Sequence, residues 1–335
     1  MEAVIRDANL DTNLDFSFNE DQQAIYDAIG RFCSQHPVEE FARQSNAAFP
    51  AALWKQLAAL GVFSPLSTDD TEGNGALLLC AICEALGEQV FPGPIADTYL
   101  AIAVTPEEEA AGLIDGTKLV CISRAGSTLL PFGTEATLFL LVDRTEVSRA
   151  AAPESVESVA TLGGEIWGRA LLRVEKTLPG AIRGLQIHNI ATAAYLASLA
   201  SRLLRDTSEY AATRKQFGSA LGDFQAVSHT LADCAIALAA ATSLTRSAAS
   251  AFSYEETVPT DSTQARRLAG AALLSARTAS LKTAFVCHQV YAGIGITLEG
   301  PVFYMSRRIR QLASQAPGQT VAQESLLTEI GLGAE

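Results

Sequence analysis

The sequence has few charged residues and no extended basic cluster. Lys, Arg, Asp and Glu make up 18% of its 335 residues, and the formal net charge at pH 7 is −13. Nucleic acids and anionic membranes are bound by clustered Lys and Arg, so the composition argues against both as partners. The one basic run, Arg307, Arg308 and Arg310, indicates either a solvated helix face or a local site for a small anion.

The sequence also lacks the cysteine spacing of a disulfide framework or a metal site. Its six cysteines lie mostly inside apolar segments, and the C-x-x-C of Cys80 and Cys83 has no second pair or His to complete a zinc site. No apolar run reaches the roughly 18 residues of a membrane span, and the first residues are acidic where a signal peptide is basic. We therefore expect a reduced, cytoplasmic protein without a metal or a membrane partner.

The hydrophobic pattern changes twice along the chain. Apolar residues make up 48% of the chain, which is long enough for two or three domains. Helical periods run through the first part, where Asn19 and the acids after it start an amphipathic helix over Phe18–Phe41. Short β-rich runs follow the turn signal Asp115–Gly116, and long helical periods return from Leu185.

This pattern predicts a mostly α fold with a small β domain. The expected parts are an N-terminal helical domain over 15–115, a shortened middle antiparallel β domain over 116–180 and a C-terminal helical bundle over 181–335. The sequence shows no repeat and no low-complexity tract.

Several motifs resemble those of the acyl-CoA dehydrogenase family. Arg-Lys-x-Phe-Gly from Arg214 follows a helix, and Phe-Gln opens the next helix at Phe224. ALWKQLAALGVFSP and EALGEQVFPGP lie in the helical front end, and QVYAGIGIT begins at Gln289. With the order of helices, β domain and helices, the resemblance covers essentially the whole chain.

The resemblance implies an oxidoreductase that binds FAD between subunits. In the family, an acyl thioester lies over the flavin, a carboxylate removes its α proton, and its β hydrogen leaves as hydride. An electron-transfer flavoprotein or another acceptor takes up the electrons. By residue-to-residue match, the ADP part of a neighbour's FAD would be bound at Arg214, Gln216, Phe217, Gln225, Gln289 and Gly293. Gln216 replaces the usual Thr.

The features that hold the flavin ring in the family are eroded here. The family's Thr-Glu-Pro-Gly-like segment corresponds to Cys121–Ser127, which keeps a Ser and a Gly but has no Glu-Pro. The Trp-Ile-Thr-like segment has no counterpart that the sequence reveals, and the β domain is short. The sequence therefore predicts only half of a flavin site.

The family's catalytic Glu is also missing from its usual place. Glu299-Gly-Pro301 resembles the anchor before it, but counting onward leads to Ala316-Pro317-Gly318, which has no carboxylate. An alternative family position, counted back from Arg214, holds His188, and the ordinary pKa of an imidazole suits a general base. His188 and Glu299 are therefore candidate catalytic residues, with a helix-cap or solvent role for His188 and a structural role for Glu299 as alternatives.

Three functions remain open. The first is a subunit of a heteromeric dehydrogenase, similar to the shortened chains that act on steroid side chains in actinobacteria, with a longer partner that brings the base. The second is a complete homo-oligomeric dehydrogenase that uses His188 or Glu299. The third is an acyl-thioester-binding protein on the same fold without FAD and without redox chemistry. The acyl group could belong to fatty acid, polyketide or steroid metabolism.

Overall fold

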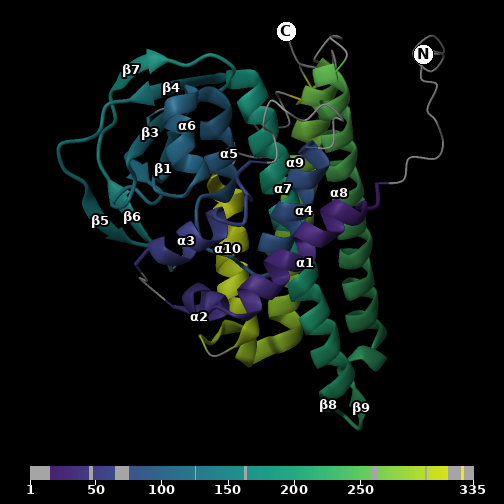
Figure 1. Cartoon of the computed structure of the whole chain (residues 1–335). Helices are drawn as coiled ribbons and strands as arrows, with labels where there is room; N and C mark the ends of the chain where they lie inside the picture. Colours follow the sequence, from purple (N-terminus) through teal and green to yellow (C-terminus); the bar gives the residue numbers. More distant parts are fainter. Residues whose placement is uncertain are drawn as a thin grey trace.

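The structure, a computed structural model, describes residues 16–44, 48–64, 75–124, 126–161, 164–257, 263–298, 300–315 and 326–327. Helices from both ends of the chain form the main body, and a β region lies at one side of it (Figure 1). The predicted order of helices, a small β region and further helices is confirmed.

The N-terminal helices begin and end at caps and breakers. Asn19 accepts a hydrogen bond from the Gln22 backbone N–H, and the Gln22 side chain accepts one from the Asn19 N–H. The helix expected over Phe18–Phe41 is instead two helices, because Pro37 cannot continue the first one. The described helices here are α1 (Glu20–Ser34), α2 (Val38–Arg43), α3 (Ala51–Ala58), α4 (Gly75–Glu88), α5 (Ile95–Val104) and α6 (Glu107–Ile114).

The β region contains two small sheets. Its strands are β1 (Val120–Arg124), β2 (Leu129–Leu130), β3 (Leu138–Asp143), β4 (Glu146–Ala150), β5 (Glu157–Ala160), β6 (Ile166–Arg169) and β7 (Val174–Thr177). The sheets have the orders β1-β3-β4-β7 and β2-β6-β5. The expectation of a wholly antiparallel region is wrong in one place, since β1 and β3 run parallel with Val120 opposite Leu138. The chain passes through β2 of the other sheet between them, which supplies the crossover that a parallel pair needs.

Three long helices form the C-terminal bundle. They are α7 (Ala181–Thr213), α8 (Gln225–Thr257) and α9 (Thr263–Tyr291), and they pack along one another. The strands β8 (Lys215–Gln216) and β9 (Ser219–Ala220) form a hairpin at the free end of the bundle (Figure 1), followed by the short turn η1 (Leu221–Asp223). The turn η2 (Ala292–Ile296) follows α9, and α10 (Pro301–Gln315) packs against α7, α9 and α2.

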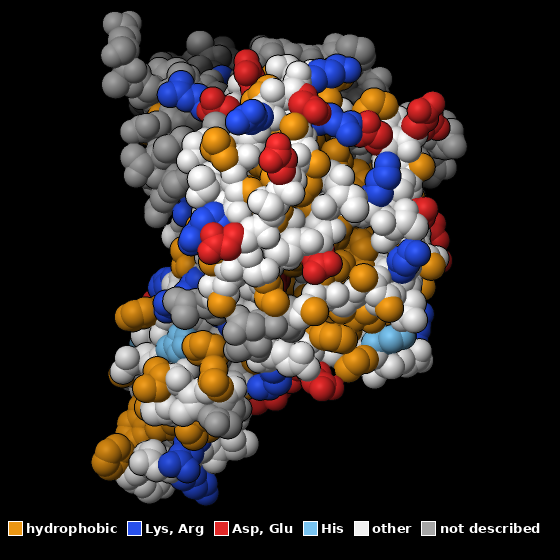
Figure 2. All heavy atoms as spheres, turned by 90° about the vertical axis from the view of Figure 1, so that its left-hand side faces the viewer, with side chains coloured by type: hydrophobic (Ala, Val, Ile, Leu, Met, Phe, Trp, Pro, Cys, Tyr) orange, Lys and Arg blue, Asp and Glu red, His pale blue; other side chains and the backbone are white. Residues whose placement is uncertain are grey.

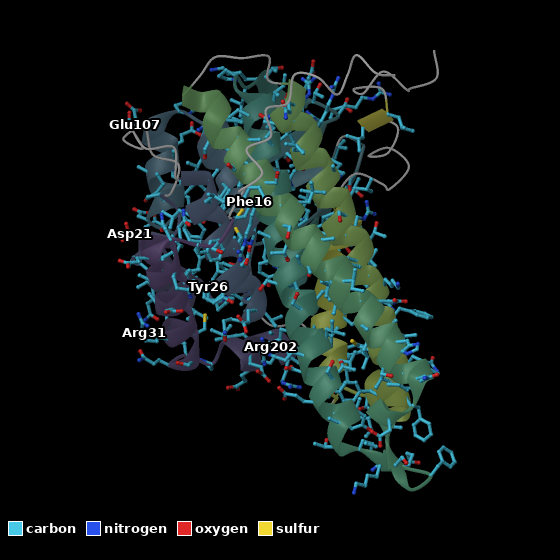
Figure 3. All side chains as sticks on the ribbon, turned by 90° about the vertical axis from the view of Figure 1, so that its right-hand side faces the viewer. Phe16, Asp21, Tyr26, Arg31, Glu107 and Arg202 are labelled. Atoms are coloured by element: carbon cyan, nitrogen blue, oxygen red, sulfur yellow. The ribbon has the colours of Figure 1, made fainter. Side chains whose placement is uncertain are left out.

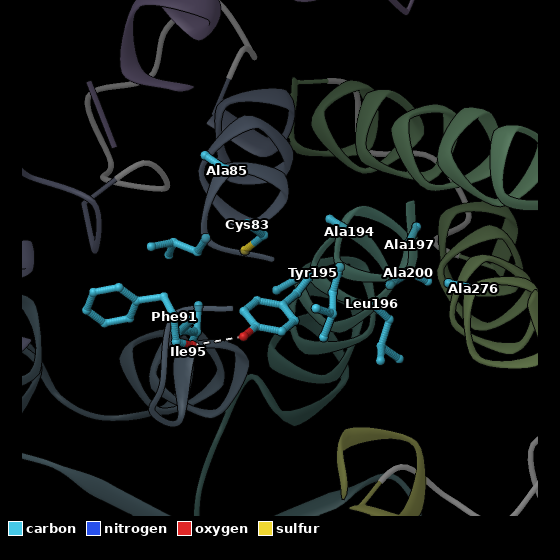
Figure 4. Packing of buried hydrophobic residues seen from close by; sticks show 14 of the residues in the cluster. Cys83, Ala85, Phe91, Ile95, Ala194, Tyr195, Leu196, Ala197, Ala200 and Ala276 are labelled. Atoms are coloured by element: carbon cyan, nitrogen blue, oxygen red, sulfur yellow. Dashed lines mark hydrogen bonds between the residues drawn. The ribbon is translucent and has the colours of Figure 1, made fainter. Parts of the chain in front are cut away.

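A close contact with α4 fixes the middle of α7. A Cβ atom at Gly87 would lie 2.4 Å from the carbonyl oxygen of Tyr195, so the approach requires glycine. Buried alanines, Ala194 and Ala197 among them, line this stretch of α7 (Figure 4). The Tyr195 hydroxyl donates a hydrogen bond of 2.9 Å to the carbonyl oxygen of Phe91. This contact holds α7 in a fixed position relative to the chain that leads into α5.

A polar network attaches α1 to α4 and the bundle, and it includes Tyr26, which Figure 3 labels on α1. The Tyr26 hydroxyl donates a hydrogen bond to the carboxylate of Glu88, and Arg205 donates one of 2.8 Å to the same group. Burial and the neighbouring Glu88 raise the pKa of Tyr26 above its ordinary value. One turn earlier on α4, Glu84 pairs with Arg246 of α8 through bonds of 2.9 and 2.6 Å.

One helix of the bundle is unusually apolar. Within the described ranges, Gln225–Ser253 alone is long and apolar enough to cross a membrane, judged by length and composition. The expectation that no apolar stretch reaches this length is therefore wrong. Many of its residues are alanines, which suit close packing, and the helix packs along α7 and α9. We assign α8 to the bundle on these contacts.

Candidate functional site

His188 and Asp97 meet on two different helices. His188 lies inside α7 and Asp97 in the first turn of α5. His188 Nε2 lies 3.0 Å from Asp97 Oδ1, and the two side chains are 14% and 17% exposed. Since a carboxylate only accepts hydrogen bonds, Nε2 carries the hydrogen, and Nδ1 is the acceptor nitrogen of the neutral ring. Nδ1 forms no hydrogen bond with any residue that the structure describes.

The pair lines a pocket between α5, α7 and α10, which we call the His188 pocket. Thr192 lies one turn after His188 on α7, and its buried hydroxyl has no hydrogen-bond partner in the described part of the chain. A buried donor without a partner suits a ligand that brings an acceptor atom. The lining residues are Gly93, Pro94, Ile95, Ala96, Asp97, Phe132, His188, Thr192, Tyr195, Arg308, Leu312 and Gln315.

Arg308 forms the α10 side of the His188 pocket and joins three parts of the chain. It donates hydrogen bonds of 2.7 Å to Glu165, before β6, and 2.7 Å to the carbonyl oxygen of Gly93, before α5. A third bond of 3.0 Å reaches Gln311. Burial opposes the charge of Arg308, but the carboxylates of Glu165 and Asp97 hold its pKa above the ordinary value. The guanidinium is therefore charged and fixed in place.

Neither interpretation of the basic run fits Arg307 and Arg308. The two side chains are 8% and 6% exposed, so they do not form a solvated face. Arg307 donates hydrogen bonds to the carbonyl oxygens of Ala42 and Gln44, and Arg308 is paired with Glu165, so an anion finds no open cation there. Arg307 and Arg308 are therefore structural, because both guanidinium groups bind other parts of the chain, whereas Arg310 is exposed.

The residues predicted to bind a neighbour's nucleotide lie together at the free end of the bundle. Tyr210 and Tyr291 stack with ring centroids 4.3 Å apart, which brings the ends of α7 and α9 together. Phe217, at the tip of the β8–β9 hairpin, is 95% exposed, and Figure 2 shows hydrophobic and basic side chains at the narrow end of the molecule. All six residues are exposed: Arg214, Gln216, Phe217, Gln225, Gln289 and Gly293.

The chemistry of this donor set fits the ADP part of FAD. The Arg214 guanidinium forms no ion pair or hydrogen bond with the described residues, and its planar fork suits a pyrophosphate. The exposed amides of Gln225 and Gln289 can donate to and accept from a ribose or an adenine. A Cβ atom at Gly293 would meet nothing within 4 Å, so the turn leaves open space beside these groups.

The segment predicted to replace the family's ring-binding motif serves the β region itself. Cys121 is fully buried, and burial raises the pKa of its thiol. Ser123 donates a hydrogen bond of 3.1 Å to the carbonyl oxygen of Leu129, and the Ser127 hydroxyl accepts one of 3.1 Å from the Leu129 N–H. The described part of Cys121–Ser127 therefore leaves no hydroxyl free for a flavin ring.

The free end of the bundle and the His188 pocket are far apart within one chain. At about 1.5 Å per residue, Arg214 lies roughly 39 Å from His188 along α7. An extended FAD is shorter than this. A cofactor bound at the free end of the bundle therefore cannot reach the His188 pocket of the same chain.

Glu299, the other candidate base, lies outside the described residues, as do Ala316, Pro317 and Gly318. Two other histidines, His36 and His288, have local contacts. His36 Nδ1 lies 2.8 Å from the Phe32 carbonyl oxygen. The His288 ring nitrogens lie 2.7 and 2.8 Å from the Gly295 carbonyl oxygen and the Ser306 hydroxyl.

Asp97, the partner of His188, could not be predicted from the sequence. Asp97 looks like an ordinary acid in the first turn of a helix, where it complements the helix dipole. Glu165 was missed for a similar reason, since it lies in a polar stretch between two short strands. The only local sequence signal for Asp97 is its position three residues after Pro94. This position does not relate Asp97 to His188, which lies 91 residues later in the chain.

Comparisons with known proteins agree with the fold and the motifs. Residues 178–318 match the family described as the C-terminal domain of acyl-CoA dehydrogenases. The chain is 27% identical to benzylmalonyl-CoA dehydrogenase of Aromatoleum aromaticum, over 70% of this chain and 80% of that protein. It is also 27% identical to the acyl-CoA dehydrogenase IpdE2 of Mycobacterium tuberculosis, over 84% of this chain and 88% of that protein.

A chain of the ChsE4-ChsE5 complex from Mycobacterium tuberculosis has the same fold, with a TM-score of 0.76 and 19% identity. The match covers 96% of this chain and 100% of that one. The predicted fold class and the predicted resemblance are therefore confirmed. Residues 178–318 match the C-terminal domain of acyl-CoA dehydrogenases, and the chain as a whole has the fold of that family.

Proposed function

We propose that the chain is a subunit of a flavin-dependent acyl-thioester α,β-dehydrogenase and that the free end of its bundle binds the ADP part of a FAD shared with a neighbouring chain. The observation that carries this proposal is the exposed Arg214, with its glutamines, roughly 39 Å along α7 from the His188 pocket. FAD supplies the acceptor for the β hydrogen. The acyl group is carried on coenzyme A or a carrier protein, and an electron-transfer flavoprotein or a similar acceptor reoxidises the flavin.

The neighbouring chain is, in this proposal, a second and longer acyl-CoA dehydrogenase-like chain. Ser123 and Ser127 are engaged inside the β region, so a flavin ring would find its hydroxyl partners on another chain. The ChsE4-ChsE5 complex, which shares the fold, joins two chains with different names. Together these observations favour a heteromer.

A second candidate is a homo-oligomer that completes its own sites. The contact between His188 and Asp97 favours it, because the pair places a histidine and a carboxylate in a pocket of this chain. In both candidates each FAD is bound by the free end of the bundle of one chain and by the pocket of another chain. They differ in whether that other chain is identical.

A visible absorption spectrum distinguishes the candidates. The protein is purified alone, and then together with an acyl-CoA dehydrogenase-like chain encoded beside it. Flavin only in the pair supports the heteromer, whereas flavin in the lone protein supports the homo-oligomer. Flavin in neither preparation contradicts both and leaves an acyl-thioester-binding protein without redox chemistry.

Arg214→Ala should weaken the retention of FAD in whichever assembly contains it. A charge-assisted hydrogen bond is worth about 1.5–3 kcal/mol, so we expect roughly 10- to 150-fold weaker binding. The flavin released on gel filtration measures this loss. Arg169→Ala is the matched control, because Arg169 is an exposed arginine of β6 that pairs loosely with Glu157. Equal flavin content in the two variants would contradict the proposal.

A further inference from the structure

A second cavity, of about 130 Å³, lies between α2, the segment before α3, α10 and the strands β5 and β6. We call it the Phe49 cavity, and its main lining residues are Phe41, Phe49, Phe132, Tyr304, Arg307 and Arg308. We propose that it is a binding site for a small neutral aromatic molecule. This inference goes beyond the proposed function, because none of the residues proposed to bind FAD lines this cavity.

The size of the cavity suits one aromatic ring. In another protein, an apolar cavity of roughly 150 Å³ stays free of water and binds benzene. The Phe49 cavity is close to this size, whereas the His188 pocket has a volume of about 30 Å³. The smaller volume holds about two water molecules. A ring compound therefore fits the Phe49 cavity and not the His188 pocket.

Aromatic side chains form the walls of the Phe49 cavity. Phe49 and Phe132 lie edge to face, with ring centroids 5.7 Å apart and ring planes at 74°. Phe132 and Tyr304 are 4% and 2% exposed, so their rings are held in place by the surrounding chain. A third ring that packs against these side chains adds edge and face contacts that are worth more than the buried area alone.

The charged groups of the cavity select a neutral molecule. Arg308 is paired with Glu165. Arg307 donates hydrogen bonds to the carbonyl oxygens of Ala42 and Gln44. An anion would compete with Glu165 for a guanidinium that is already paired, and a cation would lie beside two guanidinium groups, so burying either charge is costly. A neutral ring avoids this cost, and its π face is attracted to the guanidinium groups.

The mouth of the Phe49 cavity is polar and open to solvent. Gln44, Ala48, Glu135 and Ser158 line the cavity and are exposed. Thr134 is half-buried next to Glu135, and its hydroxyl forms no hydrogen bond with the residues that the structure describes. This hydroxyl can donate to or accept from one polar atom of a ligand. The ligand class is therefore a single ring that carries a short neutral polar group, such as a benzylic alcohol.

Fixed side chains separate the Phe49 cavity from the His188 pocket. Phe132 and Arg308 line both spaces. Three hydrogen bonds hold Arg308, and the edge-to-face contact with Phe49 holds Phe132. A ligand in the Phe49 cavity therefore contacts one side of this wall and does not enter the His188 pocket.

The first test compares four probes by ligand-observed NMR titration of the purified wild-type protein. Benzyl alcohol is the neutral ring, and benzoate and benzylammonium carry the same ring with opposite charges. Cyclohexylmethanol has the same polar group without an aromatic ring. We expect saturable binding of benzyl alcohol, and at least about tenfold weaker binding of the two charged probes. Cyclohexylmethanol should also bind more weakly, because it forms no aromatic contacts.

The second test fills the mouth of the cavity. Thr134→Trp and Ser158→Trp should each weaken the binding of benzyl alcohol by at least about tenfold, because the large side chain occupies the entrance. Ser155→Trp is the matched control, since Ser155 is exposed but does not line the cavity. Circular dichroism shows which variants fold. The comparison of probes uses the wild-type protein and so does not depend on the variants.

The outcomes either support or overturn the inference. Saturable binding of benzyl alcohol that is weakened in a folded mouth variant and kept in Ser155→Trp supports it. It is overturned if benzyl alcohol shows no saturable binding, if benzoate, benzylammonium or cyclohexylmethanol binds equally well, or if folded mouth variants bind as the wild type does. None of these results bears on the proposed function, which the flavin absorption tests separately.

Discussion

Buried charged side chains join segments that are distant in the sequence. Arg308 links Glu165 and Gly93 to α10, and Arg246 links Glu84 to α8. Burial raises the pKa of Glu84 even though Arg246 opposes this. Such pairs contribute little net stability when both partners are present, but removing one partner leaves an uncompensated charge and costs about 3–5 kcal/mol. These pairs therefore specify which segments meet.

Glu88→Gln should make the protein less sensitive to acid. Burial opposes ionisation of Glu88, but hydrogen bonds from Tyr26 and Arg205 hold its pKa below the ordinary value. A carboxylate of this kind contributes stability above its unfolded-state pKa, and the contribution is lost as the pH falls through its folded-state pKa. Urea unfolding at about pH 7 and pH 4 should therefore show a smaller loss of stability in the variant than in the wild type.

Glu108→Gln is the control for this measurement. Glu108 is an exposed acid of α6. Its variant should lose as much stability in acid as the wild type does. If Glu88→Gln and Glu108→Gln lose the same amount, the network around Tyr26 does not contribute to the pH dependence.

The residues of the candidate site differ in how well the sequence predicts them. His188 was found only by its distance from the Arg214 motif, and its partner Asp97 could not be found, because the contact joins two helices 91 residues apart. The burial of Arg307 and Arg308 was missed for the same reason: the carbonyl groups and the carboxylate that bind them come from distant segments. Periodicity shows which face of a helix is apolar, but it does not show what packs against that face.

Close packing between helices positions the His188 pocket. α4 and α7 approach so closely at Gly87 that no side chain fits between them. Gly87→Ala should therefore destabilise the protein by about 1–3 kcal/mol, the usual cost of overpacking a core. Urea unfolding followed by circular dichroism measures this change.

Gly30→Ala is a matched control on α1. A Cβ atom there would meet nothing within 4 Å, so alanine should stabilise the helix by about 0.5–1 kcal/mol. The two substitutions are chemically identical and are expected to have opposite signs. If Gly87→Ala is neutral, the close approach does not constrain α7.

Local sequence signals predicted where helices and strands lie better than they predicted how the strands pair. The Asn19 cap and the change of structure after Asp115–Gly116 are both present, and Gly116 has the positive φ of a turn. The parallel pairing of β1 with β3 was not predicted, because strand patterns carry no information about direction. The domain boundaries at 115 and 180 stay predictions.

The whole molecule has an enclosed end and an open end. The His188 pocket lies beside the β region, among helices from both halves of the chain, whereas the residues predicted to bind a nucleotide lie on an exposed hairpin and helix ends (Figure 1). At this open end Phe217 is exposed, and the Arg214 side chain has no partner among the described residues. Both make sense if another chain, with its flavin, covers this end.

Ile236→Asp and Phe285→Asp should dissociate the assembly and release its flavin. Ile236 on α8 and Phe285 on α9 are 70% and 69% exposed, although both are large and apolar. Exposed apolar side chains on neighbouring helices are typical of a surface that another chain covers. Analytical ultracentrifugation, followed at the protein and flavin absorption bands, measures dissociation and flavin loss together.

The flavin absorption of the dissociated species shows whether each FAD is bound by two chains or by one. If each FAD is bound by two chains, the slower-sedimenting species must lack flavin, because separation removes half of the contacts at once. Leu171→Asp is the control, since Leu171 is also 69% exposed but lies in the β region away from the bundle. It should leave both assembly and flavin unchanged. A dissociated chain that kept its flavin would contradict the proposal that two chains share each FAD. One FAD cannot contact both Arg214 and the His188 pocket of the same chain, because they lie roughly 39 Å apart along α7.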